Sequence, residues 1–354
     1  MFRDRPMPRP ALRQAAFAWM SRRAPFAMAL LAGTLALGCD RRPPAPGPTT
    51  TVPVTPAATV ADPPSAVPPP LSERIAMPGV ARLVAVGDLH GDLDITRKAL
   101  RLAGAIDATD AWVGGKLVVV QTGDAIDRAD GDRAVIDLLE TLRASAKKAG
   151  GALIALSGNH EIMNVQLDFR YVTPGAFAAF ADVKRDDAAA VSALARLDPL
   201  QRGRAAAFAP GGTYARRLAE WPIVMRVGDT IFVHGGLHAK HADYGLDRMN
   251  DEVRSWMLGT SPSPPAILVA EDGPVWTRDQ AAANPRSGEC AEIEKTLAKV
   301  GAKRMVIGHT PQQAGINEAC AGKVWRIDVG LSHHYGGPLQ VLEIQADQIT
   351  VRGR

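Results

Sequence analysis

The chain has 354 residues, of which 46% are hydrophobic and 22% charged, a composition typical of a globular protein with one large domain or two to three average ones. Its net charge of +4 is unevenly spread: residues 1–38 hold six Arg and one acidic residue, Asp4, which leaves 35 basic and 36 acidic residues elsewhere. The basic balance therefore belongs to the N-terminus. No basic surface argues for nucleic acid as a partner.

The N-terminus has the features of an export signal. Arg22 and Arg23 precede an uncharged apolar stretch over residues 24–38, which is short for a membrane span but suits the core of a signal peptide. Small residues before Cys39 resemble a bacterial lipoprotein signal, in which the cysteine becomes the lipidated first residue. We therefore expect residues 1–38 to be a signal peptide and the protein to be exported to the periplasmic side, anchored to the membrane through Cys39.

Other interpretations of this region stay open. A plain cleaved signal or an uncleaved anchor would contain the same apolar stretch, and translation from Met20 would give a signal of ordinary length. Asp40 resembles the residue that retains some bacterial lipoproteins at the inner membrane.

Residues 39–73 are dense in Pro, Ala, Thr and Val, which favour extended conformations and cannot build a core. We expect a disordered tether there, or a tail without a spacing role, followed by one folded domain over residues 74–354.

Two further cysteines, Cys290 and Cys320, lie outside any CxxC pattern, which argues against a zinc–thiolate site. In an exported protein an even pair favours a disulfide bond. The alternative is a pair of free, partly buried thiols.

Strands and helices alternate at the start of the folded part. The predicted elements in chain order are a strand over 82–86, a helix over 93–103, a strand over 116–121, a helix over 133–149 and a strand over 152–156. This βαβαβ order predicts a parallel sheet covered by helices, with an active site at the carboxyl ends of the strands.

The second half of the chain predicts a different mixture of elements. An Ala-rich segment over 168–210 contains no motif and reads as a helical insertion near the site. The elements expected after it are a hairpin over 223–227 and 231–233, a helix over 289–300, a strand over 305–307 and closing strands over 324–329, 338–344 and 348–351. Mixed late strands after parallel early ones predict an α/β fold in which two packed mixed sheets are flanked by helices, a four-layer α/β/β/α sandwich.

Five short segments follow apolar, strand-like runs, namely GDLHGD, GDAIDRAD, GNHE, VHGG and GHT. The first three segments are about one βα unit apart, so their polar residues are expected at one sheet edge, and the last two segments follow later strands. Together they supply six candidate metal ligands: Asp88, His90, Asp124, Asn159, His234 and His309. Carboxylate, amide and imidazole ligands without a thiolate favour manganese, iron or zinc.

Each segment alone is weak evidence. An Asp–His pair after a strand is more often a turn with a surface histidine, and the GNHE segment could simply start a helix, because Asn caps helices and Glu suits a first turn. The joint order and the strand-end placement make coincidence a poor explanation. All eight histidines of the chain also lie in or close to these segments.

The five segments resemble the signature of the phosphoprotein-phosphatase branch of the calcineurin-like metallophosphoesterases. GNHEIMN, GPVWTR and IGHTPQ are more similar still to the bacterial Shewanella-like phosphatases. The resemblance covers roughly residues 80–340. It implies that Asp88 and His90 hold a first cation, that Asp124 bridges, and that Asn159, His234 and His309 hold a second cation.

The resemblance also implies catalytic roles. His160 would be the general acid, oriented by Asp127, and Arg128 and Arg278 would bind the phosphate oxygens. The sequence departs from the family pattern in two places: Ala129 stands where the second motif usually has Gly, and Thr277 stands where GPxWYR has Tyr. The second departure puts the substrate preference in doubt more than the activity.

The function implied is a two-metal phosphomonoesterase, a protein Ser/Thr or Tyr phosphatase, that acts by in-line attack of a hydroxide bridging the cations. Phosphorylated proteins or small phosphoesters would be its substrates, and manganese its cation, with iron or zinc as alternatives. One alternative function is a nucleotide or dinucleoside-polyphosphate phosphohydrolase, although no aromatic- or Gly-rich segment suggests a base pocket. Another is a non-catalytic metal-dependent binding module, against which the complete set of site residues argues.

Overall fold

The computed structural model describes residues 72–282 and 285–353 of the chain. The expected signal peptide, Cys39 and all but the last two residues of the expected tether lie outside the described residues. Within the described ranges, no helix has both the length and the apolar character needed to cross a bilayer.

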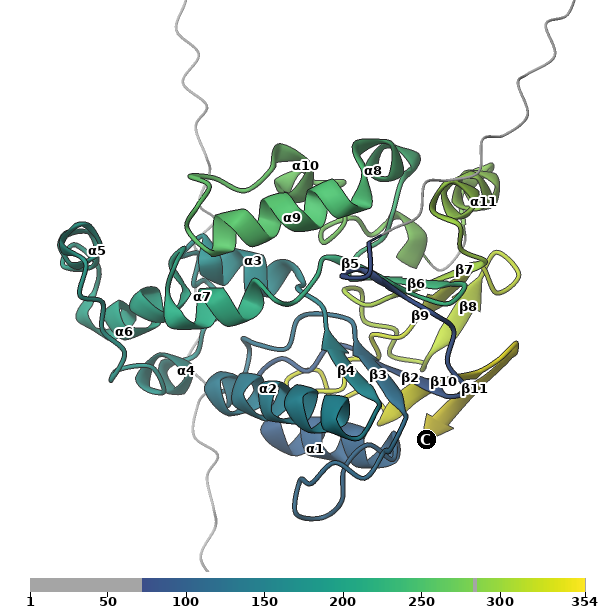
Figure 1. The fold of residues 1–354 in the computed structure, drawn as a ribbon, viewed down its shortest axis with the longest axis horizontal. Coiled ribbons are helices and arrows are strands. Elements are labelled where there is room, and N and C mark those ends of the chain that lie inside the picture. Colours follow the sequence, from purple (N-terminus) through teal and green to yellow (C-terminus); the bar gives the residue numbers. More distant parts are fainter. Residues whose placement is uncertain (1–71, 283–284, 354) are drawn as a thin grey trace, which may run out of the picture. The chain divides into compact units, whose positions relative to one another are not determined.

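Two mixed sheets form the centre of the fold (Figure 1). One has six strands in the order β1-β5-β6-β7-β9-β8 and the other has five in the order β11-β10-β2-β3-β4. The strands are β1 Ala76–Met77, β2 Leu83–Val86, β3 Val118–Gln121, β4 Ala152–Ala155, β5 Val224–Val227, β6 Thr230–Val233, β7 Arg304–Ile307, β8 Asn317–Ala319, β9 Val324–Arg326, β10 Gln340–Gln345 and β11 Gln348–Gly353. The parallel strands β2, β3 and β4 are the three predicted at the start of the domain.

Helices cover both sheets. In Figure 1, α1 and α2 lie against the sheet of β2, β3 and β4, whereas α8, α9 and α11 lie on the side of the other sheet. The helices are α1 Leu93–Leu102, α2 Asp132–Lys148, α3 Asn159–Val165, α4 Pro174–Ala178, α5 Ala188–Leu194, α6 Pro199–Phe208, α7 Thr213–Leu218, α8 Ala239–Tyr244, α9 Leu246–Met257, α10 Ala266–Val269 and α11 Glu289–Val300, with a 3-10 turn η1 Asp279–Ala281. Helices α4, α5 and α6 form the expected insertion.

The alternation of side chains along buried strands explains the layers. In β2, Leu83 and Ala85 belong to an apolar cluster that also contains Phe232 of β6 and Val306 of β7, so this cluster fills the space between the sheets. Val84, the residue between them, belongs to the larger cluster that includes the apolar faces of the helices. A strand buried on both faces needs apolar residues at every position. The predicted four-layer α/β/β/α sandwich is therefore confirmed.

The closing strands differ from the prediction. The strand expected over 324–329 ends at Arg326, because the chain then turns toward the site, where Gly330 has φ +68°. Strands β1 and β8 were not predicted, since two and three residues are too short to show an alternating pattern.

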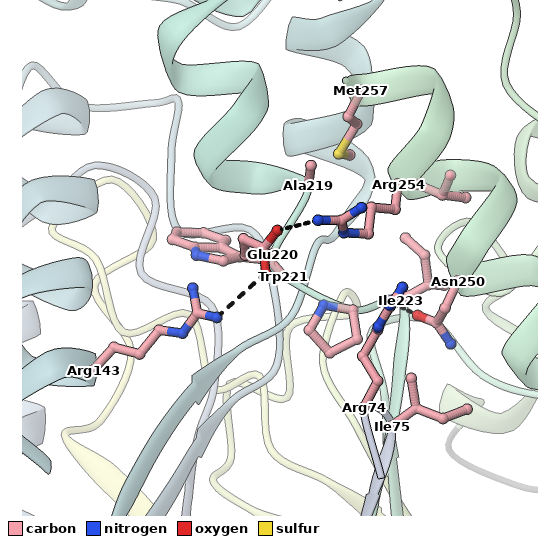
Figure 2. A pocket seen from close by; sticks show the side chains of 12 residues that line it. Arg74, Ile75, Arg143, Ala219, Glu220, Trp221, Ile223, Asn250, Arg254 and Met257 are labelled. Atoms are coloured by element: carbon pink, nitrogen blue, oxygen red, sulfur yellow. Dashed lines mark hydrogen bonds and ion pairs between the residues drawn. The ribbon is translucent and has the colours of Figure 1, made fainter. Parts of the chain in front are cut away.

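The segment between α7 and β5 is fixed from two sides (Figure 2). Glu220 lies between Arg143 of α2, at 3.8 Å, and Arg254 of α9, at 2.8 Å. The backbone N–H of Ile223 donates to Oδ1 of Asn250 at 2.7 Å. These contacts set the entry to the β5–β6 hairpin, which leads to His234.

Candidate active site

The six candidate ligands lie in the loops or the helix start directly after strand ends, and all six are buried. Asp88 and His90 follow β2, Asp124 follows β3, Asn159 follows β4, His234 follows β6 and His309 follows β7. Because β2, β3 and β4 are parallel, and β6 and β7 are parallel, each sheet presents its ligands at one edge. The structure thus brings together residues that are spread over more than 200 positions of the sequence.

The potential ligand atoms form two clusters that share one residue. Atoms of His90, Asp124 and His160 lie within 4.8 Å of one another, and so do atoms of Asp124, His234 and His309. A carboxylate has two oxygens, so the shared Asp124 can contribute to both clusters. Asp88 lies beside them: its Oδ1 is 4.0 Å from Nδ1 of His234, and its Oδ2 accepts the backbone N–H of His309 at 3.1 Å.

The three imidazoles predicted as ligands each have one ring nitrogen next to a backbone carbonyl oxygen. A carbonyl can only accept, so that nitrogen carries the hydrogen and the other is left with a free lone pair. The bonds are His234 Nδ1 to Thr122 O at 2.9 Å, His90 Nδ1 to Ile126 O at 3.3 Å and His309 Nε2 to Trp276 O at 3.0 Å. Backbone contacts thereby select the tautomers that metal ligation requires.

The residues fit a cation at the second cluster. Nε2 of His234 lies 2.9 Å from Oδ1 of Asn159 and 3.2 Å from Oδ2 of Asp124. A neutral His234 keeps its hydrogen on Nδ1, so three electron-pair donors then converge. In the cation-free site burial alone would lower the pKa of His234, but the charge of Asp124 outweighs it and raises the pKa, so a proton on Nε2 lies between these donors. A divalent cation satisfies such a set, and the ligand types are those of manganese, iron or zinc.

Electrostatics in the cation-free site point the same way. Burial lowers the pKa of both His90 and His309 to about 3, so both rings are neutral, the form that binds metals. Burial and the neighbouring carboxylate of Asp328 raise the pKa of Asp88 well above its usual value. Burial alone would raise the pKa of Asp124 too, but the charges of His234 and His160 hold it well below the usual value. Crowded buried carboxylates of this kind need positive charge nearby.

His160 and Asp127 form a hydrogen-bonded pair beside the clusters. Nδ1 of His160 donates to Oδ2 of Asp127 at 2.7 Å, which leaves Nε2 at 3.7 Å from Oδ2 of Asp124. Burial alone would lower the pKa of His160, but the charge of Asp124 and the bond to Asp127 outweigh it and raise the pKa above 6.5. Asn164 and Arg204 donate to Oδ1 of Asp127, both at 3.0 Å. The sequence contained no signal for Arg204, whereas Asn164 lies in the GNHEIMN segment.

The two predicted arginines border one cavity of about 400 Å³ above the ligands. The guanidinium of Arg128 stacks on the ring of Tyr171, 3.8 Å from its centroid. Nη1 of Arg278 donates to the carbonyl of His309 at 2.8 Å and to Oγ1 of Thr310 at 2.9 Å. The other lining residues are His90, Asp124, Asn159, His160, Met163, Asp168, Arg170, Trp276, His309, Pro311 and Tyr335.

Thr277, which the sequence singled out for substrate preference, lies apart from this cavity. It is buried, and its hydroxyl oxygen is 3.2 Å from Nε2 of His238. The insertion instead contributes directly, because Asp168, Arg170 and Tyr171 line the cavity. Tyr335 is a further lining residue that the sequence did not indicate.

The backbone at the site is strained and tightly packed. Five of the ten described non-glycine residues with positive φ are predicted site residues, namely His90, Asp124, Asp127, Arg128 and His309. Such conformations cost free energy and concentrate at functional sites. Glu161 supports them: its carboxylate accepts the backbone N–H groups of Asp124, Ala125 and Gly158 at 2.7–2.9 Å. Gly158 is required there, because a Cβ would lie 2.3 Å from Oδ1 of Asp124.

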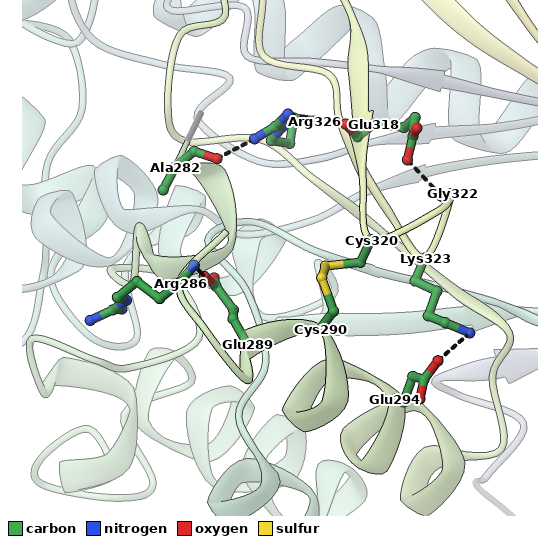
Figure 3. The surroundings of a disulfide bond; sticks show 10 residues. All are labelled: Ala282, Arg286, Glu289, Cys290, Glu294, Glu318, Cys320, Gly322, Lys323 and Arg326. Carbon is green, nitrogen blue, oxygen red and sulfur yellow. Dashed lines mark hydrogen bonds and ion pairs between the residues drawn. A yellow bond between two sulfur atoms is a disulfide. The ribbon is translucent and has the colours of Figure 1, made fainter. Parts of the chain in front are cut away.

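The predicted disulfide is present, joining Cys290 of α11 to Cys320 after β8 (Figure 3). On the neighbouring strand, Arg326 donates through Nη1 to the carbonyl of Ala282 and through Nη2 to the carbonyl of Glu318 at 3.1 Å. Ala282 follows the turn that carries Arg278. Arg326 thus ties β9 to the segment that follows η1, close in sequence to Arg278.

With the fold and this site described, the chain can be assigned to a family. Residues 81–313 match the family model described as calcineurin-like phosphoesterase, and the chain belongs to this family. It is similar to Shewanella-like protein phosphatase 2 of Arabidopsis thaliana, with 40% identity over 295 residues that cover 75% of each protein. It is also similar to Shewanella-like protein phosphatase 1 of Plasmodium berghei, with 29% identity over 268 residues, 73% of this chain and 69% of that protein.

A crystal structure of the cold-active protein-tyrosine phosphatase of a psychrophile Shewanella species has the same fold. It aligns with a TM-score of 0.61 at 22% identity, over 78% of each chain. The predicted family resemblance is therefore confirmed. The protein is a metal-dependent phosphatase, a hydrolase of phosphoester bonds.

Proposed function

We propose that the protein is a two-metal phosphomonoesterase that removes phosphate from phosphorylated proteins. The observation that carries the proposal is the sharing of Asp124 by two ligand clusters under a cavity bordered by two arginines. Asp88, His90 and Asp124 hold the first cation, and Asp124, Asn159, His234 and His309 hold the second. When bound, the two cations activate a water for attack and offset the charge of the phosphoryl group.

Protein side chains bind the phosphoryl oxygens and protonate the leaving group. Arg128 and Arg278 bind the phosphoryl oxygens, because guanidinium groups stay charged and donate in pairs to such oxygens. His160 gives the proton on Nε2 to the departing oxygen, which prevents release of an unstable alkoxide. Asp127 accepts the hydrogen of Nδ1, so the ring keeps its orientation and its positive charge is stabilised.

The cavity favours an aromatic phosphoester. Rings of Tyr171, Tyr335 and Trp276 line it beside the two arginines, and a phosphotyrosine side chain can lie against them. Phosphoserine and phosphothreonine are smaller and would leave these rings without contact. We therefore propose a preference for phosphotyrosine over phosphoserine and phosphothreonine.

A substrate panel tests these proposals. The purified chain with added manganese should hydrolyse p-nitrophenyl phosphate, and kcat/KM should be higher for a phosphotyrosine peptide than for the matched phosphothreonine peptide. The opposite order would refute the preference, and a higher kcat/KM for diadenosine tetraphosphate would refute a protein substrate. No hydrolysis of any compound with manganese, iron or zinc would refute the catalytic function itself.

We also propose that manganese is the physiological cation and that the protein is an exported lipoprotein attached through Cys39 at the inner membrane. The carboxylate and amide oxygens among the candidate ligands, without any thiolate, support the manganese proposal. The apolar stretch before Cys39 and the Cys290–Cys320 disulfide support the second, since disulfides persist in oxidising compartments. Metal analysis of protein purified without added metal tests the manganese proposal. Mass spectrometry of membrane material tests the lipoprotein proposal, which fails if Cys39 is unmodified.

A further inference from the structure

Arg204 is the largest side chain that is fully buried in the described residues, with 0% of its surface exposed. It lies on α6, in the insertion, where the sequence showed no motif. Gly203 permits this placement, because a Cβ there would lie 2.1 Å from the carbonyl oxygen of Phe180. Helix α6 can thus approach closely enough for Arg204 to reach under the site.

The guanidinium of Arg204 makes three hydrogen bonds and one further ion pair to groups around the catalytic pair. Its Nη2 lies 3.0 Å from Oδ1 of Asp127 and 2.7 Å from Oδ2 of Asp132, and its Nε donates to Oδ1 of Asn164 at 2.8 Å. Its Nη1 donates to the carbonyl of Ala176 at 3.2 Å. A lysine has a single nitrogen and could not make these four contacts, which start from three different nitrogens of the guanidinium.

These contacts leave the Asp127 carboxylate one orientation. Its Oδ1 accepts from Arg204 and its Oδ2 accepts from Nδ1 of His160, while Nδ2 of Asn164 donates to both oxygens at 3.0 and 3.1 Å. Its backbone N–H donates to Oδ1 of Asp132. Rotation of the carboxylate would break a charge-assisted bond to Arg204, the strong kind. Oδ2 is therefore held on Nδ1 of His160.

We propose that Arg204 is a positioning residue for catalysis, which fixes Asp127 and through it the His160 that donates the proton. The proposal rests on the function of His160 proposed above. A charge in a protein interior is costly to desolvate, so the burial of Arg204 is weak evidence for a purely stabilising role. Here it also couples the insertion to the catalytic pair, because the insertion lines the cavity through Tyr171 and reaches Asp127 through Arg204.

The test compares two substrates that differ in their need for a proton donor. Phenyl phosphate has a poor leaving group that needs a proton donor. The p-nitrophenolate of p-nitrophenyl phosphate is a good leaving group and departs with little help from a proton donor. Arg204→Lys should lower kcat for phenyl phosphate about 10-fold or more and kcat for p-nitrophenyl phosphate by about 2-fold at most, since a general acid contributes chiefly where the leaving group is poor. Arg202→Lys on the same helix, whose arginine bonds only backbone carbonyls of the insertion, is the matched control and should change neither.

A double-mutant cycle separates positioning from general support of the fold. In a His160→Ala background, Arg204→Lys should cause no further loss of kcat for phenyl phosphate, because the proton donor that it positions is gone. The double variant Asp132→Asn/Arg204→Met removes one buried charge of each sign and is used if Arg204→Lys does not fold. Its kcat should also fall more for phenyl phosphate than for p-nitrophenyl phosphate.

Three outcomes would overturn the proposal: equal losses for both substrates in a folded, metal-loaded variant, losses that add to those of His160→Ala, or failure of both variants to fold. Each would mean that Arg204 serves the fold alone. Failure of the proposed function is recognised separately, since the unaltered chain would then hydrolyse neither compound. A His160→Ala variant that loses equally on both compounds would remove the proton-donor role before Arg204 is considered.

Discussion

Nδ1 of His160 lies 2.7 Å from Oδ2 of Asp127, and both side chains are almost completely buried. A carboxylate without a proton only accepts hydrogen bonds, so the hydrogen between them sits on Nδ1. This fixes which nitrogen of His160 faces the cavity. In the proposed mechanism, the leaving oxygen of the phosphoester lies next to this nitrogen.

Asp127→Asn should lower kcat for phenyl phosphate by about 100-fold or more while the bound metal stays unchanged. An amide that presents its N–H₂ to Nδ1 favours the wrong imidazole tautomer, an effect known from catalytic triads. Steady-state kinetics with metal analysis checks this. Activity within a few-fold of the unaltered protein would show that the orientation of His160 does not matter.

Tyr171→Ala should weaken inhibition by inorganic phosphate about 5-fold, because the ring holds the guanidinium of Arg128 by stacking worth about 1 kcal/mol. Tyr171→Phe keeps the ring and should match the unaltered protein. Competition assays give both inhibition constants. Equal weakening in the two variants would instead assign the effect to the hydroxyl group.

Replacing Cys290 and Cys320 by Ser should lower the free energy of unfolding. The bond closes a loop with a sequence separation of 30, for which chain entropy suggests about 3–4 kcal/mol. Urea denaturation of the double variant and the oxidised protein measures the difference. A difference near zero would show that other contacts, such as those of Arg326, already restrain this loop.

Glu343→Gln should destabilise the protein at neutral pH but hardly at low pH. Burial alone would raise the pKa of Glu343, but hydrogen bonds from Arg352 and Arg82 outweigh it and hold the pKa below 4.5. The ionised carboxylate therefore stabilises the fold above pH 4.5, by about 1.5–3 kcal/mol for charged hydrogen bonds, and this contribution is lost as the pH falls through the lower folded-state pKa. The urea midpoints of the unaltered protein and Glu343→Gln, measured from pH 3 to 7, test this. A difference between the two midpoints that widens toward low pH would contradict it.

The sequence predicted the part of the molecule in which local pattern determines structure. Strands β2, β3 and β4 lie in their expected places and are apolar except for Gln121 at the end of β3, and α11 begins and ends where its periodicity indicated. The candidate ligands could be placed together because each follows a strand, and parallel strands present their carboxyl ends at one edge.

What the sequence did not contain are contacts made by packing between distant segments. Arg204 is 77 residues from Asp127, in an Ala-rich segment without a motif, and its contact depends on how closely α6 approaches. Thr277 shows the converse: its place in a family motif drew attention to it, yet its side chain bonds to His238 away from the cavity. Neither orientation follows from residue type or spacing.

In the proposed function one carboxylate, Asp124, serves two cation sites. This sharing is tested by elemental analysis of bound manganese in the unaltered chain, Asp124→Ala and His309→Ala. We expect about two ions per chain in the unaltered protein, about one in His309→Ala and well below one in Asp124→Ala, because Asp124 belongs to both clusters. Two ions retained by Asp124→Ala, or no more than one in the unaltered protein, would contradict it.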